Sequence, residues 1–268
     1  ALLGVVAGLV MVGAGEYTAG RVPLWSRAAT GGGMAILYLA VYASFGFYDL
    51  VPLLPALVFM GLVVILGWAL AIRHDSIVIA FLSLFGAFLT PALLGGEGGV
   101  GLYVGLGYLL MVDIGIVAVA SLRNWRWYTL IGMIASYSLF TAWFGQIQPD
   151  QTMAGELGLS GVFIIFVGAT TLYNILWRRV PDHWDLGLIV INAFSFYGLT
   201  FGIMWDQYEA WFGLLTALLA VFYGLVGYAA IARSGVSTLV ALYSFATGLI
   251  FLTVAAPIQL TGEWISVA

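Results

Sequence analysis

The sequence has no cysteine and no lysine, and only 7% of its 268 residues are charged. Without cysteine there is no disulfide pattern from which to infer a redox compartment. Without lysine, Schiff-base chemistry and the lysine of a phosphate-binding P-loop are excluded. No stripe of basic residues exists, so no nucleic-acid partner is expected. The low charge also excludes an ordinary soluble domain, in which about 25% of residues are charged.

Apolar residues, in contrast, make up 63% of the chain. They occur in runs of roughly 18 to 24 residues, which is long enough to cross a bilayer as a helix. The runs do not alternate between apolar and polar residues, as the strands of an outer-membrane barrel would. We therefore predict an all-α, polytopic transmembrane helix bundle with short loops, one bundle over residues 1–268. About ten spans are predicted, at residues 1–15, 27–46, 52–72, 76–95, 100–122, 127–145, 157–177, 186–204, 210–231 and 235–256.

The charged residues separate by loop. All eight basic residues are arginines that fall at every second connection: Arg21, Arg27, Arg73, Arg123, Arg126, Arg178, Arg179 and Arg233. The remaining connections and the tail contain acids and no arginine: Asp49, Glu97, Asp150, Glu156, Asp206, Glu209 and Glu263. Because cytoplasmic loops collect arginine and lysine, this pattern predicts that the arginine loops are cytoplasmic and that both ends of the chain lie outside. Most tryptophans fall at predicted span ends, as in the aromatic belt of membrane proteins.

The two ends of the chain lie in or next to apolar sequence, so we interpret it as a fragment of a longer polypeptide. A weak internal repeat relates residues 27–95 to residues 186–257; Tyr38 and Tyr197 are one of its matched pairs. Repeats of this kind occur in transporters, so the repeat hints at transport without establishing it.

Four short patterns occur in order along the chain. They are Gly31-Gly32-Gly33 before Ile36-Leu37-Tyr38, Gly86 before Leu89-Thr90-Pro91, Tyr108-Leu109-Leu110 with Trp125-Arg126-Trp127, and Pro257 before Gly262 and Trp264. Together they resemble a bacterial multi-pass membrane protein family of unknown function, domain of unknown function 2339. The resemblance implies the bacterial cytoplasmic (inner) membrane as the location. It supplies no catalytic residue and implies no cofactor.

Asp113 is the single charge predicted inside a span, and it is the main candidate for an intramembrane functional or structural polar residue. A charge at the bilayer centre costs at least about 2.5–3.5 kcal/mol on insertion scales, so Asp113 should face the bundle or a water-filled cavity. One interpretation is a proton carrier. The other is a structural hydrogen bond to a neighbouring span, with Asn174 or Asn192 as the partner.

Three further positions could interrupt helices near the outer side: Thr90, Pro91 and Pro257. Proline inside a helix removes a hydrogen bond, and broken helices often build the binding sites of transporters. Simple helix ends are the alternative. His74-Asp75 and Asp182-His183-Trp184-Asp185 lie in arginine loops, where paired, solvated charges are favoured over a metal site, and we expect no metal.

Three functions remain open on the sequence alone. A non-catalytic scaffold or subunit of a membrane complex is favoured, because the predicted spans hold one charge and few polar clusters. A transporter or lipid-handling protein with a cavity near Asp113 is the alternative. A membrane enzyme is disfavoured, since no hydrolase or metal motif occurs. The expected partners are the lipid bilayer and other membrane proteins, or further spans of the same polypeptide.

Overall fold

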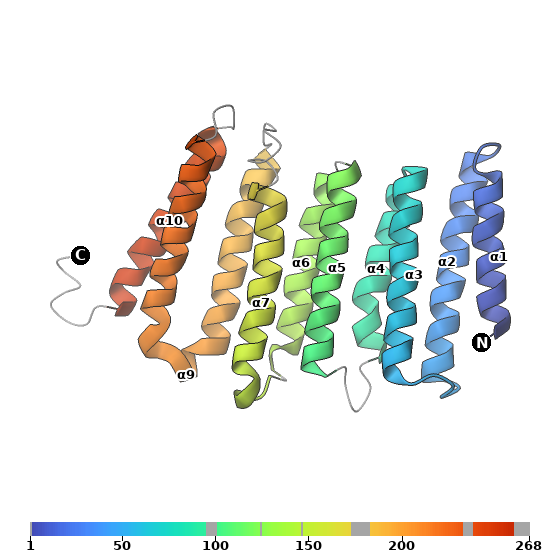
Figure 1. The fold of residues 1–268 in the computed structure, drawn as a ribbon, viewed down its shortest axis with the longest axis horizontal. Coiled ribbons are helices and arrows are strands. Elements are labelled where there is room, and N and C mark those ends of the chain that lie inside the picture. The colour runs from blue at the N-terminus through green and yellow to red at the C-terminus, as the bar shows by residue number, and fades with distance from the viewer. Residues whose placement is uncertain are drawn as a thin grey trace. The chain divides into compact units, whose positions relative to one another are not determined.

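The structure is a computed structural model that describes residues 2–94, 101–123, 125–145, 147–172, 183–232 and 238–259. These residues are mostly helical and contain no strand, which confirms the predicted all-α class (Figure 1). The elements are α1 (Leu2–Thr18), α2 (Pro23–Gly46), α3 (Leu53–His74), α4 (Ile77–Leu94), α5 (Leu102–Arg123), α6 (Arg126–Phe144), η1 (Pro149–Gln151), α7 (Thr152–Val167), η2 (Gly168–Leu172), α9 (His183–Ala232) and α10 (Thr238–Gln259).

The helices form two compact units, Ala1–Ala135 and Ser136–Ala268, and α6 contains the boundary. Seven helices of the described residues are long and apolar enough to cross a membrane. The predicted count of about ten is not reached, because α1 is shorter, α6 is not among the seven, and α9 is counted once. However, α9 is two helices joined at Tyr208, whose backbone is not helical (φ −131°, ψ 26°). The predicted break between residues 204 and 210 therefore falls where the helix changes direction.

The start of α7 corrects the sequence interpretation. The span was predicted to begin at residue 157, with Glu156 in a loop. Instead, η1 begins at Pro149, α7 follows from Thr152, and Glu156 is buried within it, 7% exposed. Proline suits a first helical position, because its fixed φ is already helical and its missing N–H has no intrahelical acceptor there. Asp113 is therefore not the only acid inside the predicted membrane region.

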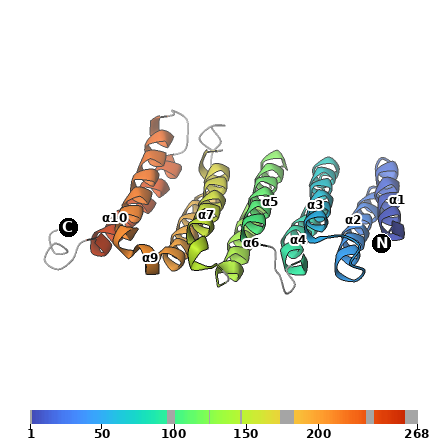
Figure 2. The same cartoon turned by 60° about the horizontal axis from the view of Figure 1, so that its bottom comes forward.

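In the first unit, α1 and α2 lie side by side in both ribbon views (Figures 1 and 2). Their backbones approach closely at glycine. A Cβ atom added to Gly33 of α2 would lie 2.7 Å from the backbone nitrogen of Val12, and one added to Gly8 of α1 would lie 2.9 Å from the carbonyl oxygen of Gly33. Small residues at such contacts are typical of membrane helices, which gain association energy from close packing.

The core of the first unit is held by hydrogen bonds as well as by apolar contacts. Trp68 of α3 is buried and donates from Nε1 to the hydroxyl of Tyr128 on α6, at 2.7 Å. Tyr128 in turn donates to the carbonyl oxygen of Ala80 on α4, at 3.0 Å. These two hydrogen bonds connect three helices. Trp68 therefore lies in the core of the unit and not in the aromatic belt.

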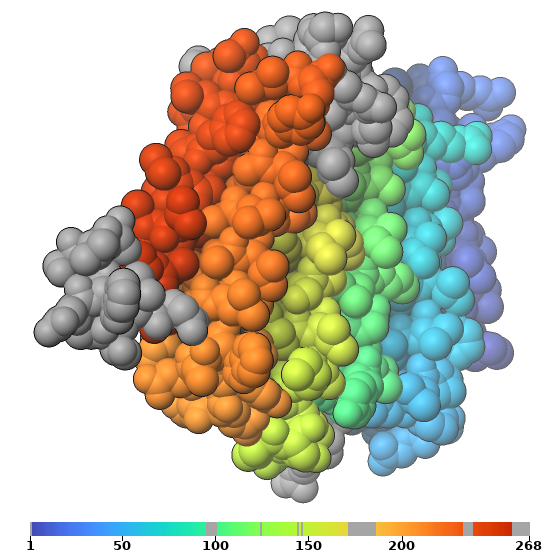
Figure 3. All heavy atoms as spheres, turned by 60° about the vertical axis from the view of Figure 1, so that its left-hand side comes forward, coloured from blue at the N-terminus to red at the C-terminus, as the bar shows by residue number. Residues whose placement is uncertain are grey.

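In the second unit, α9 packs against both α7 and α10. Figure 3 shows the second half of α9, in orange, against α10, in red. The contact again uses small residues: a Cβ added to Gly248 of α10 would lie 3.0 Å from the carbonyl oxygen of Ala220 and 3.4 Å from the nitrogen of Gly224. Ala220 and Gly224, two small residues one turn apart on α9, therefore take part in a helix–helix contact.

Candidate functional site

The proline of α4 creates a site where neighbouring helices bond to the backbone. Pro91 has no N–H, so the carbonyl oxygen of Ala87 has no helical donor four residues on. Tyr108 of α5 supplies one: its hydroxyl donates to that oxygen at 3.0 Å. The helix continues through Pro91 to Leu94. The carbonyl oxygen that the proline leaves without a donor is thus hydrogen-bonded by a side chain of another helix.

A second tyrosine reaches the same stretch from α2. Tyr38 donates to the carbonyl oxygen of Gly86 at 2.8 Å, and its hydroxyl lies 2.9 Å from that of Thr90. Thr90 itself donates back to the Gly86 oxygen at 2.8 Å. Thr90 is fully buried, and Tyr38 and Tyr108 are each less than one-tenth exposed. The predicted position at Thr90 and Pro91 therefore joins α2, α4 and α5 into a polar cluster, which we call the α4 cluster.

An apolar groove runs beside the α4 cluster. It has a volume of about 290 Å³ and is lined by α2, α3 and α4. Tyr38 and Gly86 belong to both the groove and the cluster, and the other lining residues are mostly aliphatic or aromatic. The chemistry of this lining suits a hydrocarbon chain and not an ion.

Charged residues gather at one end of the first unit. Glu16 near the end of α1 forms an ion pair with Arg73 (3.1 Å) and contacts the imidazole Nε2 of His74, whose side chain is 8% exposed. Arg27 of α2 donates to the backbone oxygen of His74 at 3.3 Å. These contacts place the end of α1, the start of α2 and the end of α3 together.

Arg123 extends this group of charges to α5. It donates to the backbone oxygen of Ile72 and lies 3.6 Å from the carboxylate of Asp75. Asp75 ends α3 in the left-handed conformation, with φ 47°. Arg21 lies in the connection between α1 and α2, and Arg126 begins α6. His74 and Asp75 therefore take part in a paired charge cluster, and the described residues contain no group of three acids or histidines that could hold a metal.

Asp113 lies in the middle of α5 and is fully buried, with 0% exposure. Its side chain is therefore not exposed to lipid, which agrees with the high free-energy cost of placing a carboxylate in the hydrocarbon core. The lining of the groove beside the α4 cluster does not include Asp113. Asn192, one of the partners predicted for it, bonds to Tyr137 and to Phe163. Asn174, the other, lies outside the described residues.

Three side-chain hydrogen bonds connect the first half of α9 to η1 and α7. Gln207 donates to the carbonyl oxygen of Pro149 (3.3 Å), Thr200 to Glu156 Oε1 (2.9 Å), and Asn192 to the carbonyl oxygen of Phe163 (3.1 Å). We call this row the α7–α9 seam. Its acceptors, at 149, 156 and 163, are spaced at heptad intervals, which keeps them on one helix face. Sequence reasoning missed the seam because Glu156 was placed in a loop.

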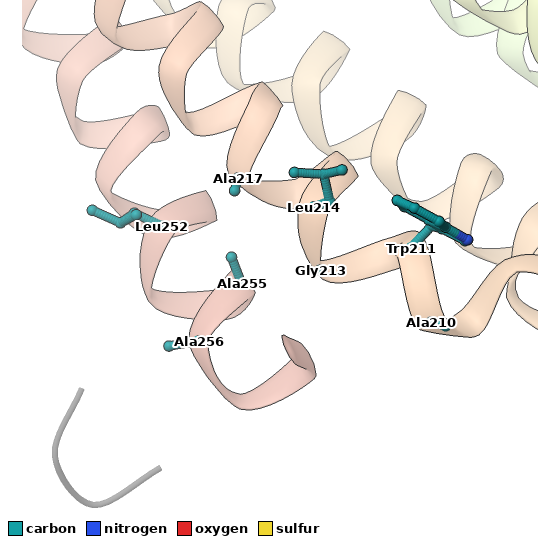
Figure 4. A pocket seen from close by; sticks show the side chains of 8 residues that line it. All are labelled: Ala210, Trp211, Gly213, Leu214, Ala217, Leu252, Ala255 and Ala256. Atoms are coloured by element: carbon teal, nitrogen blue, oxygen red, sulfur yellow. The ribbon is translucent and has the colours of Figure 1, made fainter. Parts of the chain in front are cut away.

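Pro257 lies near the end of α10, and the helix continues through it to Gln259. A groove of about 640 Å³ lies between the second half of α9 and α10, and its lining includes Ala255 and Ala256 but not Pro257 (Figure 4). The lining is apolar and rich in small residues: Ala210, Trp211, Gly213, Leu214, Ala217, Leu252, Ala255 and Ala256. The groove exists because alanine and glycine leave space that larger side chains would fill.

Several predicted features fall outside the described residues. They include Arg178, Arg179 and Arg233, and also Glu97 and the motif at Gly262 and Trp264. The side chains of the Asp182–Asp185 group are outside them too.

Apolar helices of membrane-spanning length, polar groups paired inside them and charges gathered at helix ends define the class: a multi-pass, helical integral membrane protein whose helices lie in a lipid bilayer. The chain belongs to a family described as predicted membrane protein (DUF2339), whose model matches residues 1–268. This confirms the family resemblance drawn from the sequence motifs. No curated protein and no solved structure matches the chain.

Proposed function

We propose that the chain is a non-catalytic scaffold or subunit of a membrane complex. The α4 cluster carries this proposal. Its tyrosine hydroxyls bond to backbone oxygens of another helix, and Trp68 and Tyr128 connect α3, α4 and α6 in a similar way. Polar groups used in this way fix helix positions, and they leave fewer groups to line a path for a polar substrate. A rigid helical surface is what a scaffold must offer to its partners.

Exposed apolar residues support the same proposal. Leu2, Leu3, Val6 and Val10 of α1 are each more than half exposed, although α1 packs on α2 through its other face. In a bilayer such a face contacts lipid or another membrane helix, and the second is what the scaffold proposal requires.

The chain's lack of cysteine allows a direct test of the scaffold. Single cysteines at Val6 and at Val10 would be cross-linked to neighbouring proteins in native membranes, with Tyr103 of α5, also exposed, as the comparison position. The proposal expects one defined partner band from the α1 positions. If the cysteines at both α1 positions were cross-linked only to lipid and to no protein, the result would contradict the proposal.

We further propose that the arginine ends of the helices are cytoplasmic in a bacterial inner membrane. In the first unit Arg27 and Arg123 both contact the end of α3, which carries Arg73, and Arg73 pairs with Glu16 near the end of α1. This gathering of arginines at one end of the helices supports a common membrane side for them. A cysteine at Ala19 should be shielded from an impermeant thiol reagent added outside intact cells, whereas one at Tyr48 should react. The reverse pattern would overturn the orientation.

A lipid-handling protein is the second candidate, and the groove between α9 and α10 favours it. An acyl chain fits a lining of alanine, leucine and tryptophan, and Trp211 is 67% exposed at its edge. Ala217→Leu would fill the groove, and Ala229→Leu adds the same volume at an exposed position of the same helix. This candidate expects less co-purified lipid in the first variant only. Equal lipid in both variants would remove it.

A further inference from the structure

The middle position of the α7–α9 seam differs from the other two. At Pro149 and Phe163 the acceptor is a backbone carbonyl, which is neutral. At Glu156 the acceptor is the carboxyl group of a side chain that is deeply buried. One of its oxygens, Oε1, accepts from Thr200, and the other, Oε2, has no hydrogen-bond partner among the described residues.

The described part of the second unit offers no arginine or lysine to compensate a negative charge there. That part comprises residues 136–145, 147–172, 183–232 and 238–259. The titratable residues on the elements packed against α7 are Asp150 on η1 and His183, Asp185, Tyr197, Asp206, Tyr208, Glu209, Tyr223 and Tyr228 on α9. Asp150, Asp206 and Glu209 are exposed, and the side chains of His183 and Asp185 are not described.

An ionised carboxylate at Glu156 would be unfavourable in these surroundings. Burying a charge without a partner costs several kcal/mol after relaxation, and a single hydroxyl donor offsets only a fraction of that. A metal ion would need several more oxygen ligands, and the described residues contain no cluster of acids or histidines that would supply them. A proton on Oε2 removes the charge and leaves Oε1 free to accept from Thr200.

We propose that Glu156, held by Thr200, is a proton-binding site inside the membrane. The step is a simple association: a proton bonds to Oε2, the carboxylate becomes a neutral carboxylic acid, and the hydrogen bond from Thr200 to Oε1 is kept. This goes beyond a scaffold, because it gives the second unit a group whose charge changes with proton supply.

The exposed end of the seam carries acidic residues. Gln207 and Pro149 bond at 3.3 Å, and the exposed acids Asp150 and Asp206 are their immediate neighbours in sequence, with Glu209 close by. Glu156 lies seven residues from Pro149, and Thr200 lies seven from Gln207, which is about 10 Å along each helix. Exposed carboxylates attract cations and exchange protons rapidly with water.

Infrared difference spectroscopy of the purified protein in lipid nanodiscs tests the proposal. A protonated acid has a carbonyl stretch that a carboxylate lacks. At neutral pH we expect such a band in the wild-type protein and its loss in Glu156→Gln. Asp113→Asn is the matched control, because it removes the second acid that is buried among the described residues and should leave this band in place.

A second variant tests the role of Thr200. Thr200→Val keeps the shape of the side chain and removes the donor to Oε1, so the carbonyl band of Glu156 should persist at higher frequency. Thr216→Val, which removes another buried threonine of α9, should not move it. A Glu156→Gln spectrum identical to the wild type would overturn the proposal, as would an unshifted band in a folded Thr200→Val protein.

Discussion

The hydroxyl of Tyr108 donates, at 3.0 Å, to the carbonyl oxygen of Ala87, the oxygen that Pro91 leaves without a helical donor. A helix of this membrane protein is thus completed by a side chain from its neighbour. The hydrogen bond explains how α4 accommodates a proline. In a bilayer no water is present to donate to the carbonyl oxygen that the proline leaves free, and the tyrosine hydroxyl donates to it instead.

Tyr108→Phe should destabilise the fold by about 1–3 kcal/mol, because it leaves a buried carbonyl unpaired. Pro91→Ala restores a backbone N–H and should reduce the cost of losing the tyrosine hydroxyl. A double-mutant cycle by denaturant titration in mixed micelles measures this coupling. Tyr103→Phe, at a position that is 68% exposed on the same helix, is the control and should change little. Additive effects at positions 108 and 91 would contradict the relationship.

Gly33→Ala should destabilise the packing of α1 on α2 by about 1–3 kcal/mol, the usual cost of overpacking a tight contact. Its new methyl group would lie 2.7 Å from a backbone nitrogen, which cannot rotate away. Gly13→Ala is the matched control, since nothing lies within 4 Å of its added Cβ. Thermal unfolding of both variants measures the difference, and we expect Gly13→Ala to be neutral or slightly stabilising. Equal melting temperatures would show that the helices do not approach as closely as described.

The two contacts of Glu16, with Arg73 and with His74, should contribute differently to stability, because the two partners differ in burial. Arg73→Ala removes a side chain that is 73% exposed and should cost less than about 1 kcal/mol. His74→Ala removes a side chain that is 8% exposed and should cost more, because it also leaves a gap beside Glu16. Unfolding of each variant at low and high salt measures the contributions. We expect salt to weaken the effect at Arg73 more than that at His74.

Asp113→Asn should fold normally, because the amide keeps the shape and the polar character of a side chain with no exposure. Asp113→Leu should be destabilised by about 1–3 kcal/mol, since it removes the interaction that the buried Asp113 side chain makes. The comparison separates a structural hydrogen bond from a role in moving protons. If a pH-dependent activity is found, its loss in a well-folded Asp113→Asn protein would favour the proton role, and unchanged activity would remove it.

The helix boundaries could be predicted closely where a long apolar run ends in a polar or charged residue. The predicted span 52–72 matches α3 at Leu53–His74, and 100–122 matches α5 at Leu102–Arg123. Composition alone is enough to predict such helices, because any apolar run of sufficient length is stable as a helix across a bilayer.

The candidate sites were less predictable. Thr90 and Pro91 were noticed as a helix interruption, but their bonding to Tyr38 and Tyr108 depends on which helices become neighbours. The sequence predicts a loop at Glu156, because an acid usually marks the end of a span, and this prediction is wrong. The signal that could have corrected this is Pro149 followed by Asp150, a common way for a helix to begin.

The break in α9 is a single residue, Tyr208, so the two halves of that helix are joined without slack. Thr200 is eight residues before it, and the groove next to α10 begins two residues after it, at Ala210. The threonine that bonds to α7 and the residues that line the groove are therefore parts of one continuous element, and Thr200 and Ala210 are only ten residues apart on either side of its joint.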